Sequence, residues 1–348
     1  MEPVTHALAS LALSRAGLNR TSRLATPLMV VAGLTADLDL LSYFAGPSIF
    51  LEIHGTLLHS LLGSALAMCV LAAAACMLDH RVPRAAIWGL RRKRPEEAPL
   101  SFRTAMILCL IAGGAHLLLD LCGTYGVRPF WPFQGRWYAW DLTPAVDLWV
   151  LLILLAGLLL PALFQLVSEE IGERRKPGRI GPGAMVALVL VGAYCGWRAS
   201  MHARAIQILL SRDYHGAPAL SAGAFPLANS PLEWRGVVST DGSLETLEVS
   251  FVPGSTFDPD RSVTSYKPDA SPALDAAEHT ETARRFVRYA QFPLATMVRV
   301  DDSYECSLRD LRYAIDSHVF GELAATIKLD VDGHVTGQDL RFGADSGP

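Results

Sequence analysis

The sequence predicts an α-helical membrane domain over residues 1–200, with a short N-terminal helix and about four transmembrane helices, followed by a small soluble α+β domain over residues 201–348. Of the 348 residues, 51% are hydrophobic and 18% are charged, whereas soluble domains carry about 25% charged residues. Long apolar runs lie before residue 201, and alternating strand-like patterns lie after it. Part of the chain is therefore expected to lie in lipid.

The apolar runs differ in length. Residues Val4 to Leu18 are too few to cross a bilayer, which requires about 20 residues. We expect this stretch to form a short helix that dips into the membrane from one side. The longer runs, which supply the transmembrane helices, are 27–44, 61–78, 104–120, 147–166 and 183–200.

The C-terminal region carries the signals of a separate soluble domain. Two pairs of alternating segments are each joined by Asp-Gly, which is a strong hairpin signal. The first pair is 232–240 and 243–252, and the second is 325–331 and 334–342. Between them, residues 275–289 have the pattern of one amphipathic helix.

Basic residues in the short links predict the orientation, because Lys and Arg favour the cytoplasmic side. The links 15–26, 79–102 and 168–180 are rich in Lys and Arg. The stretch 45–56 has no basic residue, and 124–146 has only Arg128 and Arg136. These two classes of link alternate along the chain, so the C-terminal domain is expected outside the cytoplasm.

His116 and Asp120 are the centre of the functional prediction. Residues four apart on a helix lie on the same face, so an imidazole nitrogen and a carboxylate reach one point in space. Buried in lipid, both groups need partners. The predicted topology brings further His and Asp side chains to the same membrane face. The resulting metal-ligand candidates are His6, Asp37, Asp39, His54, His59, His116 and Asp120, with Asp141 and Asp147 as additional candidates.

Mixed imidazole and carboxylate ligands suit zinc, manganese or iron. We expect one to three divalent ions, with zinc as the first candidate, and hydrolysis of a phosphoester or lipid-linked substrate by a metal-activated water. Asp39, His59 and Asp120 are the expected catalytic residues. A formal charge of −4 gives no basic surplus for nucleic acid.

Simpler interpretations exist for each of these residues. A His-x-x-x-Asp pair is often a hydrogen-bonded core pair. Asp37 and Asp39 lie on different faces of a continuous helix, so either the helix ends there or only one of them is a ligand. His54 and His59 flank a helix start and could cap it, and Asp141 and Asp147 could be N-caps of the next span. The aromatic loop 127–141 is most simply an interfacial belt.

Several motifs resemble the YdjM-type family of membrane-bound proteins described as metal-dependent hydrolases. They are Thr5-His6-Ala7, Asp37-Leu-Asp39, His54-Gly-Thr-Leu-Leu-His59-Ser60, His116-Leu-Leu-Leu-Asp120, Thr124-Tyr-Gly126 and the Trp131-Pro-Phe133 to Trp140 loop. The resemblance covers about residues 1–165. It implies a multi-pass protein of the bacterial inner membrane, and the C-terminal domain lies outside the resemblance. The order of ligands is also distantly similar to zinc-dependent phospholipase C.

The chain departs from this family pattern at two places. Ala36 replaces a proline, and Gly55 stands where the family has an arginine, which would be a natural phosphate clamp. Two other functions remain open at this point: a metal-binding or transport protein, and a non-catalytic anchor for an extracytoplasmic interaction domain. The expected partner is membrane lipid or a lipid-linked substrate, and the C-terminal domain gives no indication of its protein partner.

Overall fold

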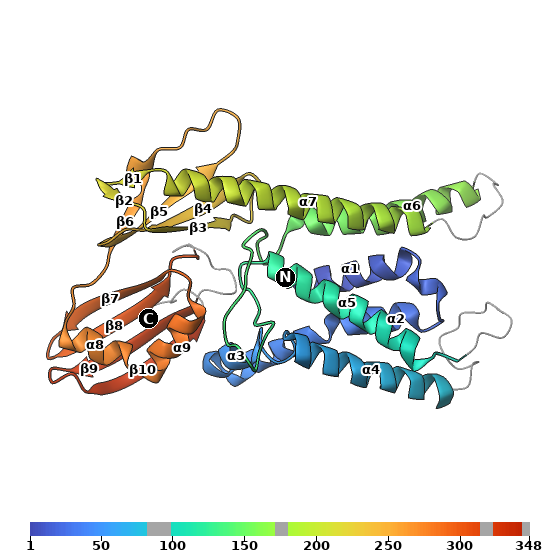
Figure 1. Ribbon diagram of the computed structural model, residues 1–348, viewed down its shortest axis with the longest axis horizontal. Helices are drawn as coiled ribbons and strands as arrows, with labels where there is room; N and C mark the ends of the chain where they lie inside the picture. Colours follow the sequence, from blue (N-terminus) through green and yellow to red (C-terminus); the bar gives the residue numbers. More distant parts are fainter. Residues whose placement is uncertain (82–98, 171–179, 314–322, 343–348) are drawn as a thin grey trace. The chain divides into compact units, whose positions relative to one another are not determined.

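The computed structural model describes residues 1–81, 99–170, 180–313 and 323–342, and the chain falls into two compact units (Figure 1). The first unit contains Met1–Leu40 and His54–Trp197. The second contains Leu41–Ile53 together with Arg198–Pro348. Each unit has buried apolar clusters of its own.

The N-terminal part of the chain is helical. Its elements are α1 (Pro3–Arg15), η1 (Leu18–Arg20), α2 (Ala25–Leu34), η2 (Ala36–Ala45), α3 (Pro47–Ile53), α4 (Leu61–Arg81), α5 (Phe102–Cys122), α6 (Leu148–Glu170) and α7 (Ile180–Leu210). Among the described residues, four helical segments are long and apolar enough to cross a membrane: Ala25–Ala45, Leu61–His80, Phe102–Cys122 and Gly181–Leu210. A shorter apolar segment, Leu148–Pro161, lies in α6. The prediction of a helical membrane domain is confirmed.

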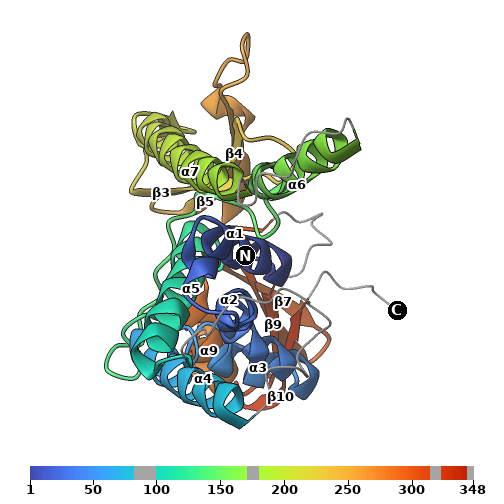
Figure 2. The same ribbon diagram turned by 90° about the vertical axis from the view of Figure 1, so that its right-hand side faces the viewer.

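Within the first unit, α1 lies against α2, α5 and α6, and α5 also packs on α2 and α4 (Figures 1 and 2). The buried cluster of these helices contains small residues on both α2 and α5, among them Ala32 and Ala112. At Gly33, an added Cβ would come within 1.9 Å of the Ser10 hydroxyl oxygen. A glycine at this position therefore allows α1 and α2 to approach closely, as small residues do between membrane helices.

The run predicted as one helix over residues 27–44 changes its geometry midway. The α-helix ends at Leu34, and the 3₁₀-helix η2 begins at Ala36. This settles the alternative at Asp37 and Asp39, because the α-helix ends before both residues. The tighter 3₁₀ turn, with about three residues per turn, sends the two carboxylates in different directions.

The second unit contains two four-stranded antiparallel sheets. The first sheet has the order β3 (Ser221–Pro226), β4 (Glu233–Ser239), β5 (Ser243–Ser250), β6 (Val263–Tyr266). The second has the order β10 (Val335–Phe342), β9 (Leu323–Asp330), β8 (Ser303–Asp310), β7 (Pro293–Val300). A small pair, β1 (Asp213–Tyr214) and β2 (Ala217–Pro218), precedes them. Both predicted hairpins are confirmed, as β4–β5 and β9–β10.

The amphipathic segment 275–289 forms two helices, so the prediction of a single helix is wrong. They are α8 (Pro272–Glu278) and α9 (Glu281–Tyr289). Thr280 lies between them, and its hydroxyl accepts a hydrogen bond from the N–H of Ala283 at 3.2 Å. The same hydroxyl donates to the carbonyl of Ala277 at 2.8 Å. The threonine side chain thus ends one helix and caps the next.

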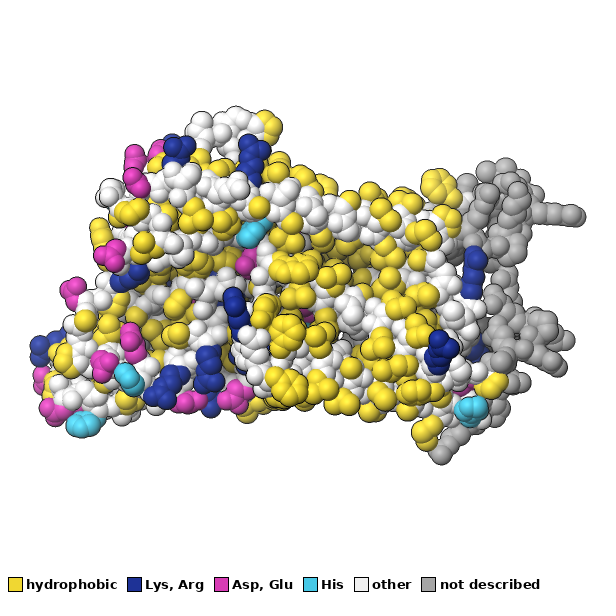
Figure 3. Space-filling view, viewed as in Figure 1, with side chains coloured by type: hydrophobic (Ala, Val, Ile, Leu, Met, Phe, Trp, Pro, Cys, Tyr) yellow, Lys and Arg dark blue, Asp and Glu magenta, His cyan; other side chains and the backbone are white. Residues whose placement is uncertain are grey.

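The surface follows this division into helices and strands. Hydrophobic side chains cover the visible face of the helices, whereas acidic and basic side chains gather over the strands and α8–α9 (Figure 3). Leu66, Val70 and Val189 are examples of large apolar side chains that lie exposed on α4 and α7. A bilayer would cover such residues, in keeping with the membrane assignment.

Candidate metal centre

Four segments of the first unit bring His and Asp side chains together. His6 comes from α1, Asp37 and Asp39 from η2, His54 and His59 from the loop before α4, and His116 and Asp120 from α5. They form three overlapping groups whose ligand atoms lie within 4.8 Å of one another: His6–Asp37–His116, Asp39–His54–His59 and His59–His116–Asp120. All seven principal candidates are therefore neighbours.

The third group is the most compact. His116 Nε2 lies 3.0 Å from Asp120 Oδ2, and His59 Nε2 lies 3.1 Å from the same oxygen. The two Nε2 atoms lie 3.2 Å apart. Ligands about 2.0–2.1 Å from a tetrahedral zinc lie about 3.3 Å from one another. The three donor atoms therefore have nearly the mutual spacing that one zinc ion requires.

The far side of each imidazole in this group has a fixed partner. His116 Nδ1 lies 2.7 Å from the carbonyl oxygen of Gly33, which can only accept, so Nδ1 carries the proton. His59 Nδ1 lies 2.8 Å from Asp39 Oδ2. Both rings consequently present Nε2 toward Asp120. Metal-binding histidines are typically held in this way, by a carbonyl or carboxylate on the other nitrogen.

Asp39 holds the second group by hydrogen bonds. His54 Nδ1 lies 2.6 Å from Asp39 Oδ1, and the N–H of Gly55 donates to Oδ2 at 3.2 Å. Asp39 is only 5% exposed. The separations between Asp39 and the two histidine nitrogens are hydrogen-bond distances, so Asp39 fixes the orientation of His59 and His54.

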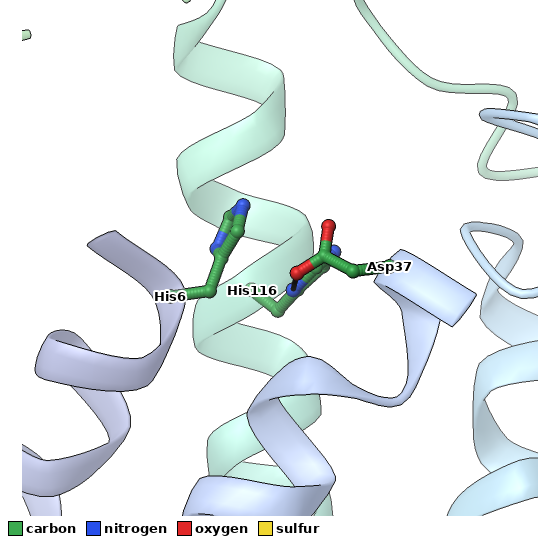
Figure 4. Close-up of side chains that lie close together, drawn as sticks. All are labelled: His6, Asp37 and His116. Atoms are coloured by element: carbon green, nitrogen blue, oxygen red, sulfur yellow. Dashed lines mark ion pairs between the residues drawn. The ribbon is translucent and has the colours of Figure 1, made fainter. Parts of the chain in front are cut away.

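The side chains of His6, Asp37 and His116 form a group with wider spacing between their ligand atoms (Figure 4). The rings of His6 and His116 are stacked with centroids 3.8 Å apart. His116 Nδ1 lies 3.9 Å from Asp37 Oδ2, and His6 Nε2 lies 3.1 Å from Asp120 Oδ1. The N-terminal amine of Met1 also contacts Asp120 Oδ1. Asp37 and His6 therefore adjoin the compact group from opposite sides of His116.

Five of the seven clustered residues are buried, and Asp37 and His54 are partly exposed. His6, His59 and His116 are each at most 2% exposed, and Asp120 is 7% exposed. Burial of charged and polar groups is costly unless they are paired or bind a metal. The donor set of nitrogen and carboxylate oxygen fits zinc, manganese or iron.

The two additional candidates lie outside these groups. Asp147 Oδ1 accepts hydrogen bonds from the N–H groups of Trp149 and Val150, and Tyr194 donates its hydroxyl to Oδ2 at 3.0 Å. Asp147 is thus the N-cap of α6, as the simpler interpretation has it. Asp141 has a positive φ of 53° and joins none of the three groups.

A fourth group of candidate ligands lies in the second unit, at the β9–β10 turn. Asp330 Oδ1 accepts from the N–H groups of Asp332 and His334, at 3.0 and 2.8 Å. His334 Nδ1 lies 3.2 Å from Asp330 Oδ2. These contacts are those of a turn that binds its own backbone, and both Asp332 and His334 are exposed. The group is a structural part of the hairpin.

Gly33 and Trp137 lie near the centre and were not predicted as site residues. Gly33 accepts a hydrogen bond from His116 with its backbone carbonyl. A backbone contact of this kind cannot be predicted from a pattern of side chains. Trp137 lies so close to Gly55 that an added Cβ there would come within 2.7 Å of its ring. Trp137 therefore fills the space of a side chain at position 55, where the resembled motif has an arginine. In the sequence, a glycine at position 55 in place of an arginine, together with the nearby aromatic loop, was the only indication that Trp137 would lie here.

Comparison with known families supports the membrane assignment. A family model described as YdjM inner membrane protein matches residues 1–205, which include all seven clustered residues. No curated protein and no solved structure matches the chain. The second unit extends beyond the matched residues.

Proposed function

Because this chain belongs to the YdjM inner membrane protein family, we propose that it is a membrane-embedded, metal-dependent hydrolase that acts on a phosphoester or lipid-linked substrate. The centre of the proposal is the group of His59, His116 and Asp120. The C-terminal domain is proposed to lie on the extracytoplasmic side of the membrane, and the links rich in Lys and Arg on the cytoplasmic side.

The proposal of a bound metal rests on one observation: three potential ligand atoms, from His59, His116 and Asp120, converge. His59 and His116 each engage their Nδ1 with an acceptor, so in the neutral form each ring would direct an Nε2 lone pair at the other and at Asp120 Oδ2. Such acceptors repel one another unless a cation lies between them. A divalent metal ion satisfies all three at once, and the separations of 3.0–3.2 Å leave the matching space.

The protein residues have distinct roles in this proposal. His59, His116 and Asp120 hold the ion, and Asp39 positions His59 through its Nδ1. His6 and Asp37 adjoin this compact group on either side of His116. Bound there, the metal would polarise a phosphoryl oxygen and lower the pKa of a water molecule toward neutrality.

A lipid-linked substrate is proposed because the ligands lie at or near the ends of membrane-spanning segments. Asp37 and Asp39 lie in the second half of Ala25–Ala45, and Asp120 lies two residues from the end of Phe102–Cys122. His59 precedes Leu61–His80 by two residues. If these ends share one side of the membrane, as the basic links predict, the centre lies at headgroup depth.

The full-length protein, purified in detergent, tests this function by metal content and by turnover of 4-nitrophenyl phosphate. We expect about one or more divalent ions per chain, turnover that chelator abolishes, and recovery when zinc or manganese is restored. The proposal would be contradicted by a wild-type protein that contains no metal and whose turnover does not change with chelator, zinc or manganese. The cluster would then have only a structural role.

A further inference from the structure

The second sheet of the C-terminal unit has an open edge at β7. The sheet runs in the order β10-β9-β8-β7, so β10 and β7 are its edge strands. Both α3 and α9 contact β10. β7 pairs with β8 on one side, and no strand or bridge of the described residues pairs with its other side. The unpaired N–H and C=O groups of such an edge can bind another extended segment.

The register of the ladder shows which backbone groups of β7 point outward. Leu311 donates its N–H to the carbonyl of Phe292 at 3.0 Å, so these two residues form a hydrogen-bonded pair. Such pairs alternate with non-hydrogen-bonded pairs along an antiparallel ladder. Every second residue of 293–299, including Ala295 and Met297, therefore directs its backbone groups away from β8.

A groove of about 660 Å³ lies between this edge and α9. Its apolar lining includes Ala283 and Val287 on α9, Ala295 on β7 and Leu308 on β8. The register pairs Ala295 with Leu308, so both side chains lie on the face of the sheet that α8 and α9 cover (Figure 1). Val287 is 52% exposed, and covering it would be favourable. A segment added beside β7 would direct every second side chain into this groove.

The charged residues of the groove favour an acidic partner. Arg284 and Arg288 line it together with one acidic residue, Glu278, which leaves an excess of positive charge. Arg288 lies 3.8 Å from Glu281. Arg284 forms no ion pair and no side-chain hydrogen bond with any residue that the structure describes. The guanidinium donors of Arg284 are therefore available to a carboxylate.

We propose that the groove between β7 and α9 binds an extended, acidic segment of a partner protein, which adds a strand to β7. The outward backbone groups of β7 bind the main chain of this segment. An apolar side chain of the segment covers Val287 and Leu308, and a carboxylate two residues further on, on the same face, pairs with Arg284. Main-chain hydrogen bonds then give affinity, and the alternate side chains give specificity. A lipid headgroup would use the charge alone and leave the edge of β7 unpaired.

The experiment measures the binding of a fluorescein-labelled peptide, Thr-Val-Thr-Glu-Thr-Val-Thr, to the full-length protein in detergent by fluorescence anisotropy. In a strand, the Val and Glu side chains of this peptide share one face and the Thr side chains share the other. Two copies of the peptide are N-methylated, one at the even and one at the odd residues, so each loses the donors of one edge. We expect one copy to bind as the parent peptide does and the other to bind at least about tenfold more weakly. A peptide with Lys in place of Glu should also bind more weakly.

Variants of the protein test the two halves of the groove. Arg284→Gln should weaken binding about three- to tenfold, the effect of a charged hydrogen bond at an exposed site. Arg309→Gln is the matched control, because Arg309 follows Leu308 on β8, is exposed and lies on the opposite face of the sheet. Met297→Pro removes an outward N–H but no bond to β8, and Pro293 already occupies an equivalent position. We expect Met297→Pro to abolish peptide binding with a melting temperature close to that of wild type.

Several outcomes would overturn the proposal. A wild-type protein that does not bind the acidic peptide, or binds the lysine peptide equally well, has no site for an acidic segment. Equal binding of the two N-methylated copies would show that β7 is not the docking edge, and this comparison remains decisive if Met297→Pro does not fold. Without peptide binding, an affinity for dihexanoylphosphatidylglycerol that falls in Arg284→Gln would assign the groove to a lipid headgroup. Self-association that Met297→Pro abolishes would instead assign the edge to a second copy of this chain.

Discussion

His59 Nε2 and His116 Nε2 lie 3.2 Å apart, although the two residues are separated by 57 positions in the sequence. On the opposite side of each ring the Nδ1 atom is engaged, by Asp39 in His59 and by the carbonyl of Gly33 in His116. Both Nε2 atoms also lie within 3.1 Å of Asp120 Oδ2. The proposed metal centre depends on this relationship.

Asp120→Ala should abolish metal binding and turnover while the protein still inserts into the membrane, because removing a carboxylate makes insertion easier. A purely structural cluster would behave differently. It would lose about 1–3 kcal/mol of stability from buried groups left unpaired, and bound metal would be absent from wild type as well. Metal content and melting temperature of both proteins, each with and without chelator, distinguish these cases.

Asp39→Asn should weaken metal binding by about 10- to 100-fold, the usual effect of losing a partner that orients a ligand. An amide no longer selects the tautomer of His59 that presents Nε2 to the metal. Asp147→Asn is the control, because asparagine is as good an N-cap as aspartate. Competition with a metal-sensitive dye measures both. Equal affinity in the two variants would show that Asp39 does not position His59.

Gly33→Ala should destabilise the first unit by about 1–3 kcal/mol, as overpacking does. The new Cβ would lie 1.9 Å from the Ser10 hydroxyl and would push α1 away from α2. On α5, an added Cβ at Gly114 meets nothing within 4 Å. Gly114→Ala should therefore be neutral or slightly stabilising. Melting temperatures in detergent test the pair, and a Gly33→Ala variant as stable as Gly114→Ala would contradict the close approach of α1 and α2.

An alkaline phosphatase fused after the C-terminus should be active, because the alternation of basic links predicts that end outside the cytoplasm. This orientation requires α6 to cross the membrane together with the four longer segments. Its 23 residues span about 35 Å at 1.5 Å per residue, which is sufficient. A fused cytoplasmic reporter should be inactive. If that reporter were active instead, the metal ligands would not share the predicted side.

A fragment of residues 198–348 should unfold cooperatively by itself and lose stability in acid. Burial raises the pKa of the Glu245 carboxyl, but hydrogen bonds from Ser243, Ser262 and Thr264 outweigh it and bring the pKa below its ordinary value of 4.5. The ionised carboxylate thus stabilises the fold above about pH 4.5 and ceases to do so as the pH falls further. Denaturant unfolding from pH 3 to 7 should show this loss, and Glu245→Gln should reduce it. A broad, non-cooperative transition would mean that the fragment is not an independent domain.

Much of the fold could be predicted from local patterns. Apolar runs identified the helices of the membrane domain, and Asp-Gly turns between alternating segments identified the β4–β5 and β9–β10 hairpins. Both signals act over short distances and need no knowledge of the rest of the chain. The break at Thr280 was missed because a threonine inside an amphipathic pattern becomes a cap only when its hydroxyl competes successfully for a backbone N–H.

The sequence by itself determined which residue types were available to the centre, and the four-residue spacing of His116 and Asp120 determined that those two share one helix face. Tertiary structure alone decided the rest. The end of α2 at Leu34 allows Asp37 and Asp39 to reach different neighbours, the carbonyl of Gly33 orients His116, and Gly55 admits the ring of Trp137. Each depends on backbone geometry and on the approach of distant segments, which side-chain patterns along the chain do not encode.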